Sequence, residues 1–368
     1  MAAPRFVSGK HLRIGIFGAG AVGGYVGGHL AHEGHDVTLI GQWPEHVEHV
    51  RREGLRLRST EGEVVVRPAI LHLHDVQSLF RRPLDLVFLC VKSYDTDWAT
   101  AMIASYLSPE GFVVSMQNGM NEERVAAQVG WSRTLGVVLN TIGVNSTEPG
   151  LAMRTSRPGG PSHTVFRVGE PDGRVSPRAT ELARLLSAVD SADVTTNLWG
   201  ERWSKLVTNS ISHGLSTVTG LNSRGVLASS ELRGVAIGLA AEGIRVGEAL
   251  GYALVDIYGT APARWTAADR GNAAATGEID RRLRARLERV TEAERPSAAQ
   301  DLMRGRRTEL DYTNGIIVAR AETLRIPVPM QQALLTKARV VEVGAVPPSI
   351  EHATGLARSI PASRPLCE

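Results

Sequence analysis

Short apolar runs alternate with helix-like stretches through the first half of the chain. These runs, rich in Val, Ile, Leu and Phe, occupy residues 12–17, 36–40, 84–91, 111–116 and 134–142. Strands that are buried on both faces and separated by helices are what a parallel sheet requires. Segments 55–59, 63–68 and 163–170 mix charged and apolar residues, which indicates half-exposed strands that extend the sheet in antiparallel fashion. The pattern therefore predicts an α/β first domain.

The pattern changes near residue 197, where strand-like runs give way to segments rich in Ala, Arg, Glu and Leu. These segments predict helices at 197–219, 229–251, 258–290, 296–324 and 329–344. We therefore expect an α/β domain at 1–196 and an all-α domain at 197–345. Residues 346–368 are rich in Pro, Ser and Ala and lack an apolar period, so we expect a loose tail there.

Composition narrows the class of protein. The 368 residues are 43% hydrophobic and 21% charged, with a formal net charge of +3 and scattered arginines, which favours anionic small molecules over nucleic acid as partners. Cys90 and Cys367 offer neither a disulfide framework nor a metal-ligand spacing. The chain begins without the apolar core of a signal peptide and has no long uncharged apolar segment. We expect a cytoplasmic protein that binds neither nucleic acid nor a membrane.

A glycine-rich turn follows the first apolar run. In "RIGIFGAGAVGGYVGGHLAHEGHDVTLI" three glycines have the spacing G-x-G-x-x-G between a predicted strand and a predicted helix, and a second strand follows. This context is typical of dinucleotide binding, with the pyrophosphate at the helix N-terminus. Gly18 would permit the tight turn, Gly20 would let the pyrophosphate approach, and Gly23 would let the helix pack on the strand. The candidate cofactor-binding residues of this turn are Gly18, Ala19, Gly20, Ala21, Val22 and Gly23.

The end of the second strand bears on the choice of cofactor. An acidic residue there favours NAD, and a basic residue favours the extra phosphate of NADP. This chain has Gly41 and Gln42 at that place, and Gln42 could hydrogen-bond to either form. Arg51 and Arg52 lie about three helical turns further on. The residues alone leave NAD(H) and NADP(H) open.

A polar ladder interrupts the apolar stripe of the helix predicted at 197–219. Lys205, Asn209 and His213 recur at steps of four, so they drift only about 80° around the axis over roughly 12 Å. They could line one wall of a pocket or form a solvated stripe. The neighbouring residues leave little of this helix to face water, because they are mostly apolar: Trp203, Leu206, Val207, Ile211 and Leu215.

Several ordered motifs resemble those of the ketopantoate reductase (2-dehydropantoate 2-reductase) family. They are "GAGAVGG", "VKSYDT", "QNGMNEE", "WSKLVTNSISHGLS" and "SAAQDLMRGRRTELDYTNG", and the resemblance runs from about residue 12 to 340. It implies an N-terminal Rossmann-type domain, followed by an all-α domain of the 6-phosphogluconate-dehydrogenase-like kind. It also implies NADPH-dependent reduction of a 2-oxo acid, with ketopantoate as first-choice substrate, in pantothenate biosynthesis.

The resemblance assigns roles residue by residue. Lys205 matches the family's catalytic lysine, which donates a proton to the ketone oxygen as hydride reaches carbon. Asn209 and Ser297 match substrate-binding residues. Asn118 matches an asparagine that touches both nicotinamide and substrate. The remaining matches are Lys92, near the cofactor, and Glu309, which could pair with Lys205 or bind cofactor and substrate groups; Asp301 could belong to the same wall.

Structural alternatives remain at two of these positions. Lys92 could be a solvated loop lysine, and Glu309 could form a surface salt bridge with a neighbouring arginine. Two histidine-containing stretches, "HLHD" at 72–75 and "EHVEH" at 45–49, lack a second half, so we expect no metal site.

Three positions depart from the family's pattern. His213 stands where the family usually has a second substrate-binding asparagine, and imidazole is bulkier and can carry charge. Gln42 replaces the arginine often seen after the second strand, so the expectation of NADP(H) rests on the resemblance. "PSAAQD" lacks the serine and methionine that usually follow Ser297.

Two other interpretations of the whole chain stay open. One is a relative that reduces another 2-oxo acid or keto compound, as His213 would allow. Another is a sensor that binds the dinucleotide without turning it over, against which the retention of Lys205, Asn209 and Glu309 argues. The long helices of the second domain could also pair two subunits as a homodimer.

Overall fold

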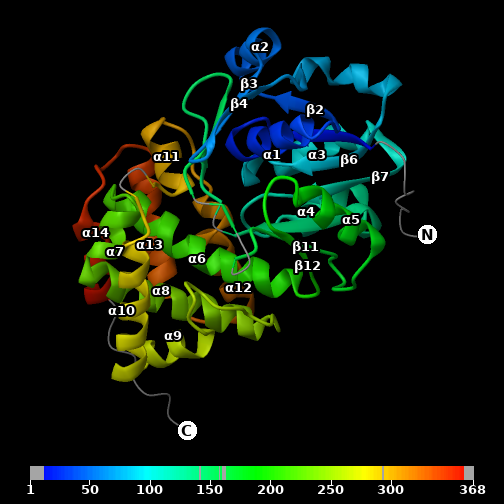
Figure 1. Cartoon of the computed structure of the whole chain (residues 1–368). Coiled ribbons are helices and arrows are strands. Elements are labelled where there is room, and N and C mark those ends of the chain that lie inside the picture. The colour runs from blue at the N-terminus through cyan, green and yellow to red at the C-terminus, as the bar shows by residue number, and fades with distance from the viewer. Residues whose placement is uncertain (1–11, 141, 157, 160–162, 292–293, 360–368) are drawn as a thin grey trace. The chain divides into compact units, whose positions relative to one another are not determined.

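The computed structural model describes residues 12–140, 142–156, 158–159, 163–291 and 294–359. Internal packing divides the chain into one unit that ends at Leu198 and another that begins at Trp199. Figure 1 labels many of their elements. The strands of the first unit are β1 (Arg13–Phe17), β2 (Asp36–Gly41), β3 (Leu55–Ser59), β4 (Gly62–Val66), β5 (Ala69–His72), β6 (Leu84–Leu89), β7 (Leu107–Ser115), β8 (Thr134–Leu139), β9 (Val144–Asn145), β10 (Leu151–Arg154), β11 (Phe166–Gly169) and β12 (Ala192–Thr195).

The helices of the first unit connect these strands. They are α1 (Ala21–His32), α2 (Pro44–Glu53), α3 (Thr96–Ala104), α4 (Glu122–Val129) and α5 (Pro177–Leu186), with the 3₁₀ helices η1 (Leu73–Arg81), η2 (Ser93–Asp95) and η3 (Trp131–Arg133).

The large sheet has the strand order β12-β11-β8-β7-β6-β1-β2-β5. From β5 to β8 every neighbouring pair is parallel, while β11 runs antiparallel to β8. The core strands are buried on both faces: Ile16 packs in one apolar cluster and Phe17 in another. This burial explains the continuous apolar runs. Strand order reverses direction between β1 and β6, the place where ligands bind in open α/β sheets.

A second sheet has the order β4-β3-β10-β9 and lies against α1. The sequence predicted the antiparallel pair β3 and β4 as part of the main sheet, and this placement was wrong, whereas β11 does extend the main sheet in antiparallel fashion. The small sheet forms because β10, which follows about 90 residues later, pairs in parallel with β3.

Helix α1 lies between the two sheets (Figure 1) and contacts both through glycines. A Cβ atom at Gly27 would lie 2.6 Å from Leu39 of the large sheet, and one at Gly28 would lie 2.6 Å from Leu57 of the small sheet. Gly23, one turn earlier, also faces the large sheet, because a Cβ there would lie 2.9 Å from Ile16, whereas a Cβ at Gly24 would make ordinary contact with Ala152 of the small sheet at 3.7 Å. Side chains at Gly23, Gly27 and Gly28 would push the sheets away, so these glycines allow the helix to pack closely on two sides.

The regular elements of the second unit are helices, and the only β-pairing in its described residues is an isolated bridge between Ile257 and Thr260. Its elements are α6 (Leu198–Thr219), whose first residue belongs to the first unit, α7 (Ser223–Ala228), α8 (Ser230–Ala249), α9 (Pro262–Asp269), α10 (Ala273–Leu287), α11 (Ser297–Met303), η4 (Leu310–Tyr312), α12 (Asn314–Leu324), α13 (Pro329–Glu342) and α14 (Ile350–Ser359). The fully buried Trp203 of α6 donates from Nε1 to the carbonyl of Gly243 in α8 at 2.8 Å.

The helix predictions need three corrections. The helix expected at 258–290 is two helices, because Gly271 has φ of +88° and Asn272 caps α10 through Ala275. The helix expected at 296–324 is interrupted between α11 and α12, where Gly305 has φ of +63°. The loose tail expected at 346–368 was wrong for α14, in which Ala353 and Leu356 are buried. Residues 360–368 of that tail lie outside the described residues.

Across the part of the chain that the structure describes, no helix combines the length and apolar character needed to span a bilayer.

Candidate active site

The glycine-rich turn after β1 is held between the ends of two other strands. The backbone amides of Gly18 and Ala19 donate to the carbonyl of Ile40 at the end of β2, at 3.0 and 3.1 Å. Gly18 has φ of +105°, and a Cβ there would lie 2.7 Å from the backbone of Cys90 after β6. Gly23 is equally constrained, because its Cβ would lie 2.2 Å from the carbonyl oxygen of Gly18. These two glycines are required by packing.

Gly20 differs from both, because a Cβ there would meet nothing within 4 Å. Gly20 is exposed and occupies the N-cap of α1, where it supplies no side chain to cap the helix. Ala21 and Val22 follow in the half-buried first turn, which contains no acidic residue. Open space beside uncapped helix amides suits an anionic group such as a pyrophosphate. The turn thus fits the dinucleotide that the sequence predicted.

The loops after β6 and β7 are bonded to each other beside this turn. Gln117 donates from Nε2 to the carbonyl of Val91 and to Thr96 Oγ1, both at 2.9 Å. Ser93 Oγ donates to the carbonyl of Asn118 at 3.1 Å. The half-buried Lys92 and Asn118 therefore lie on two cross-linked loops at the carboxyl ends of neighbouring parallel strands.

The end of β2 carries no charge that would select between NAD and NADP. Gln42 is exposed, and Gly41 pairs with His72 of β5. Arg51 of α2 forms ion pairs with Glu48 at 3.0 Å and with Asp75 at 2.6 Å. Two carboxylates therefore already neutralise the charge of Arg51.

The polar ladder of α6 is largely buried. Asn209 is 4% exposed and His213 is 7% exposed, while Lys205 is half-buried. Burial lowers the pKa of the Lys205 ammonium to about 8, and the positive charges of Arg286 and Arg202 act in the same direction. The solvated-stripe interpretation is therefore wrong. Among the described residues, no carboxylate forms an ion pair with Lys205, which leaves its proton available.

Ser297 lies in the first turn of α11. Its Oγ atom is buried and has no hydrogen-bond partner among the described residues. A buried hydroxyl without a partner is costly, so this atom is available to hydrogen-bond to a bound group. Asp301 is buried one turn further along the same helix.

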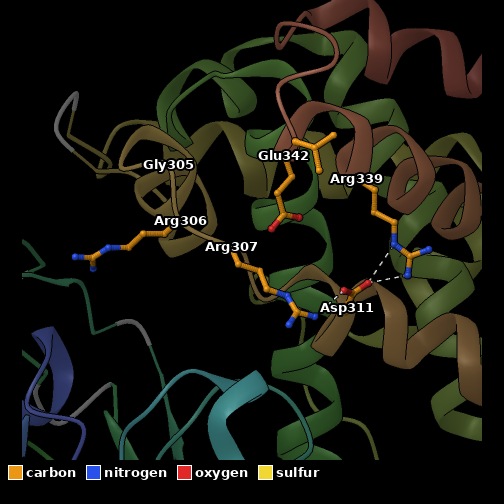
Figure 2. Close-up of a pocket in the computed structure, with 7 residues that line it drawn as sticks. Gly305, Arg306, Arg307, Asp311, Arg339 and Glu342 are labelled. Carbon is orange, nitrogen blue, oxygen red and sulfur yellow. Dashed lines mark hydrogen bonds and ion pairs between the residues drawn. The ribbon is translucent and has the colours of Figure 1, made fainter. Parts of the chain in front are cut away.

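Glu309 lies in a segment that α13 holds on one side. Glu342 accepts from the backbone amide of Thr308 at 2.6 Å and from its hydroxyl at 3.2 Å. Arg339 donates to Asp311 at 2.7 Å. Figure 2 shows Asp311, Arg339 and Glu342 at a pocket of about 520 Å³, with Arg306 turned away from them. Glu309 itself is 4% exposed, so it is not the surface salt bridge that the sequence left open.

A second anchor ties the same segment to α6. Asn314, the first residue of α12, donates from Nδ2 to the carbonyl of Ser210 at 3.0 Å and to Gln331 at 2.8 Å. Gly214 leaves room for this contact, because a Cβ there would lie 3.2 Å from the Asn314 amide. The polar ladder and the segment that carries Glu309 are thus joined within the second unit.

Two regions of the chain match a known sequence family. The family described as "Ketopantoate reductase PanE/ApbA" matches residues 14–163, and "Ketopantoate reductase PanE/ApbA C terminal" matches residues 197–342. The chain belongs to the ketopantoate reductase family. Like its relatives it is an oxidoreductase, and the family acts on small keto acids with a nicotinamide dinucleotide.

Individual ketopantoate reductases agree with this assignment over nearly their full length. The 2-dehydropantoate 2-reductase of Halobacterium salinarum is 29% identical over 334 residues, which are 90% of this chain and 99% of the relative. The crystal structure of a PanE/ApbA family ketopantoate reductase from Ralstonia eutropha JMP134 has a TM-score of 0.73 at 27% identity, covering 90% of this chain and 98% of that one.

A third comparison concerns the fold alone. The structure of D-mandelate dehydrogenase with NADH and anilino(oxo)acetate has a TM-score of 0.75 at 20% identity and covers 90% of this chain and 98% of that one. Together these comparisons confirm the predicted family, the α/β fold with its helical second part, and the predicted class of enzyme.

The ketopantoate reductase motifs form two groups. The glycine turn, Lys92 and Asn118 gather at the carboxyl ends of the first unit's strands, and Lys205, Asn209 and His213 form one face of α6. Ser297 and Glu309 belong to neighbouring segments of the second unit. The roles of these residues in binding and catalysis stay predictions.

Sequence reasoning missed Asn314 and Glu342. Both form hydrogen bonds with groups that are distant in sequence. The available signal was a polar residue type at a buried or half-buried helix position.

The histidines of segments 45–49 and 72–75 make structural contacts. His46 is buried, and its Nδ1 accepts from the amide of Gly150 at 3.1 Å, while His72 pairs with Glu48 at 2.7 Å. Burial lowers the pKa of His46 to about 4, so its imidazole is neutral. Within the residues that the structure describes, no cluster of three or more His, Cys, Asp or Glu side chains could hold a metal ion.

Proposed function

We propose that this protein reduces 2-dehydropantoate to pantoate with NADPH, with Lys205 as the proton donor. The observation that carries the proposal is the half-buried Lys205 ammonium, whose pKa is lowered to about 8 and which has no carboxylate partner among the described residues. An acid of that pKa is largely protonated at neutral pH and still gives up its proton readily. A bound nicotinamide cofactor would supply the hydride.

Several residues of the chain would have separate roles in this reaction. The Lys205 ammonium stabilises negative charge on the ketone oxygen and then transfers the proton to it. Asn209, one turn along α6, would hold the substrate's hydroxyl or carboxylate, and the buried Ser297 hydroxyl would donate to the carboxylate. Asn118 would orient the reacting groups, since hydride transfer needs the two carbon atoms about 3–3.5 Å apart.

The cofactor would lie along the glycine turn. Gly20 leaves the space, and the amides at the start of α1 would hold the pyrophosphate. Lys92, on the loop after β6, would add a positive charge near the cofactor. The preference for NADPH over NADH follows the family resemblance and is the part of the proposal that most needs measurement, because Gln42 is neutral.

Steady-state assays test substrate and cofactor together. Purified protein is supplied with ketopantoate and a panel of bulkier 2-oxo acids, each with NADPH and with NADH. We expect the highest kcat/KM for ketopantoate with NADPH. A much higher kcat/KM for another acid would replace ketopantoate as substrate and would identify the buried His213 as the first position to vary.

The Lys205→Ala variant tests the mechanism. We expect kcat to fall by roughly 10²–10⁴-fold, as for the loss of a positioned general acid. Dinucleotide affinity, measured by fluorescence titration, should change little. If turnover persists at the wild-type rate, Lys205 is not the acid. If the wild-type protein binds NADPH tightly but reduces none of the acids, it is a dinucleotide sensor.

A further inference from the structure

Tyr258 occupies a backbone conformation that tyrosine rarely adopts. Tyr258 and Gly259 are the central residues of a tight turn, with φ of +52° and +71°. Ile257 and Thr260 close the turn by exchanging two backbone hydrogen bonds of 3.0 and 3.1 Å. Positive φ at both central residues defines a type I′ turn, which favours Asn and Gly. A bulky side chain is disfavoured there, so an outlier of this kind points to a function for the side chain.

The ring of Tyr258 lies against the polar face of α6. Its hydroxyl donates to the carbonyl of Thr208 at 3.4 Å, and the same carbonyl accepts from the hydroxyl of Ser212 at 3.1 Å. Thr208 and Ser212 follow Lys205 by three and seven residues, which places them within about 60° of Lys205 around the helix axis. The turn therefore delivers the tyrosine ring to the side of α6 that carries the proton donor.

Arg286, from the last turn of α10, covers this ring. Its guanidinium carbon lies 5.3 Å from the centroid of Tyr258, and its side chain is half-buried. Among the described residues, no carboxylate pairs with Arg286 and no group accepts a hydrogen bond from it. Its neighbour Arg284 behaves differently, because it is exposed and paired with Asp280 at 2.6 Å.

The charge of Arg286 affects the pKa of Lys205. After burial, Arg286 is the largest influence lowering the pKa of Lys205. The charge of Arg286 also lowers the pKa of the Glu294 carboxylate. Burial is the larger effect on that group and raises its pKa. A half-buried guanidinium offers planar paired donors that match a carboxylate, and none of these donors is used by a described residue.

We propose that Arg286, held against the ring of Tyr258, binds the carboxylate of the 2-oxo acid whose ketone oxygen receives the proton from Lys205. This inference rests on the proposed function. In a 2-oxo acid the carboxyl carbon is bonded directly to the ketone carbon, so the cation that binds the carboxylate must lie beside the proton donor. The buried Ser297 hydroxyl would donate to the same carboxylate.

The test compares R286Q and R286K with the matched control R284Q. Each variant is assayed with the 2-oxo acid that the wild type reduces best and with the corresponding primary amide, which lacks the negative charge. For R286Q we expect the KM of the acid to rise roughly 10- to 100-fold, the usual effect of losing a charge-assisted hydrogen bond. The KM of the amide should change by less than about twofold.

The other variants and readouts make the expectation specific. R286K keeps the charge without the planar fork, so its KM for the acid should lie between those of wild type and R286Q. R284Q should match the wild type. Removing the Arg286 charge should also move the alkaline limb of the pH–rate profile upward, because the Lys205 pKa rises. Thermal melting of each variant reports its folding.

Three outcomes would overturn the inference. Equal loss on acid and amide would show that Arg286 only maintains the fold. Weakened NADPH binding with an unchanged KM for the acid would assign Arg286 to the cofactor. A KM for the acid in R286Q equal to that of the wild type would remove Arg286 from substrate binding.

Calorimetric titration of the hydroxy-acid product into NADP⁺-saturated protein separates this inference from the proposed function. Binding that is lost in R286Q supports Arg286 even if the wild type catalyses no reduction, in which case the proposed function alone fails. If the wild type reduces the acid and R286Q binds product as tightly as wild type, the inference alone fails. A wild type that binds no acid overturns both.

Discussion

Lys205 is kept in an environment that disfavours its charged form. An ammonium loses hydration on burial, and two nearby guanidinium groups add repulsion, which together lower its pKa from 10.5 to about 8. Between these two values the unfolded chain binds more protons than the folded one, so stability rises with pH over that range. Below about pH 8 the folded protein bears the full cost of the charge.

Replacing Lys205 with methionine should therefore exchange activity for stability. We expect K205M to have a higher free energy of unfolding than the wild type at pH 7, with a gain that shrinks as the pH approaches 10.5. Urea unfolding at several pH values measures it. In the wild type, kcat/KM should fall as the pH rises through about 8, because the donor loses its proton. A flat pH profile to pH 10 would contradict the assignment.

The residues of the site differ in how far the sequence predicts them. The spacing of Lys205, Asn209 and His213 on one helix predicted a common face, because helical geometry relates residues four apart. Arg286 and Glu342 gave no such signal. Glu342 binds Thr308 across a separation of 34 residues, a contact that only the tertiary packing of α13 creates.

At the scale of elements, α1 is shaped by its glycines. We expect Gly20→Ala to fold like the wild type, within about 0.5 kcal/mol, and to weaken NADPH binding, because the new methyl group enters open space beside the helix N-terminus. Gly23→Ala should cost about 1–3 kcal/mol, since its methyl group would meet the Gly18 carbonyl. Thermal melting and fluorescence titration distinguish the two effects. Equal melting temperatures for both variants would refute this division of roles.

The segment that carries Glu309 depends on α13. We expect Glu342→Gln to weaken the two hydrogen bonds to Thr308, at a cost of about 1–2 kcal/mol in stability. Because Glu309 follows Thr308 directly, kcat/KM should also fall, by roughly tenfold. The exposed Glu322→Gln of α12 is the control and should behave as wild type. If the variant loses stability but keeps its activity, the contact between Glu342 and Thr308 has no role in catalysis.

Strands were easier to predict than helix ends. The apolar runs of the large sheet are buried on both faces, and a short run of that kind is compatible with few structures other than a buried strand. The breaks between α9 and α10 and between α11 and α12 depend on single residues in left-handed conformations, which an Ala- and Arg-rich pattern conceals. Helix α14 was missed because its amphipathic face is short, with Ala353 and Leu356 as its buried residues.

At the scale of the whole molecule, α14 completes the helical unit. It contacts α8 and α13, and the amide of Ser349 just before it donates to the carbonyl of Val218 at 2.9 Å. We expect Leu356→Ala to destabilise the protein by about 2–3 kcal/mol, as other buried leucines do. Chemical denaturation measures this difference. A loose tail would instead leave the unfolding midpoint unchanged.

The placement of α1 between two sheets links parts of the molecule that share no ligand. A helix with this many glycines has little stability of its own, each costing up to about 1 kcal/mol relative to alanine, so it persists only while both layers enclose it. The small sheet contains no predicted site residue, yet its loss would free the helix whose first turn we propose to bind the phosphates. Occupancy by NADPH should therefore slow amide exchange in β3 and β10 as well, through thermodynamic linkage rather than contact.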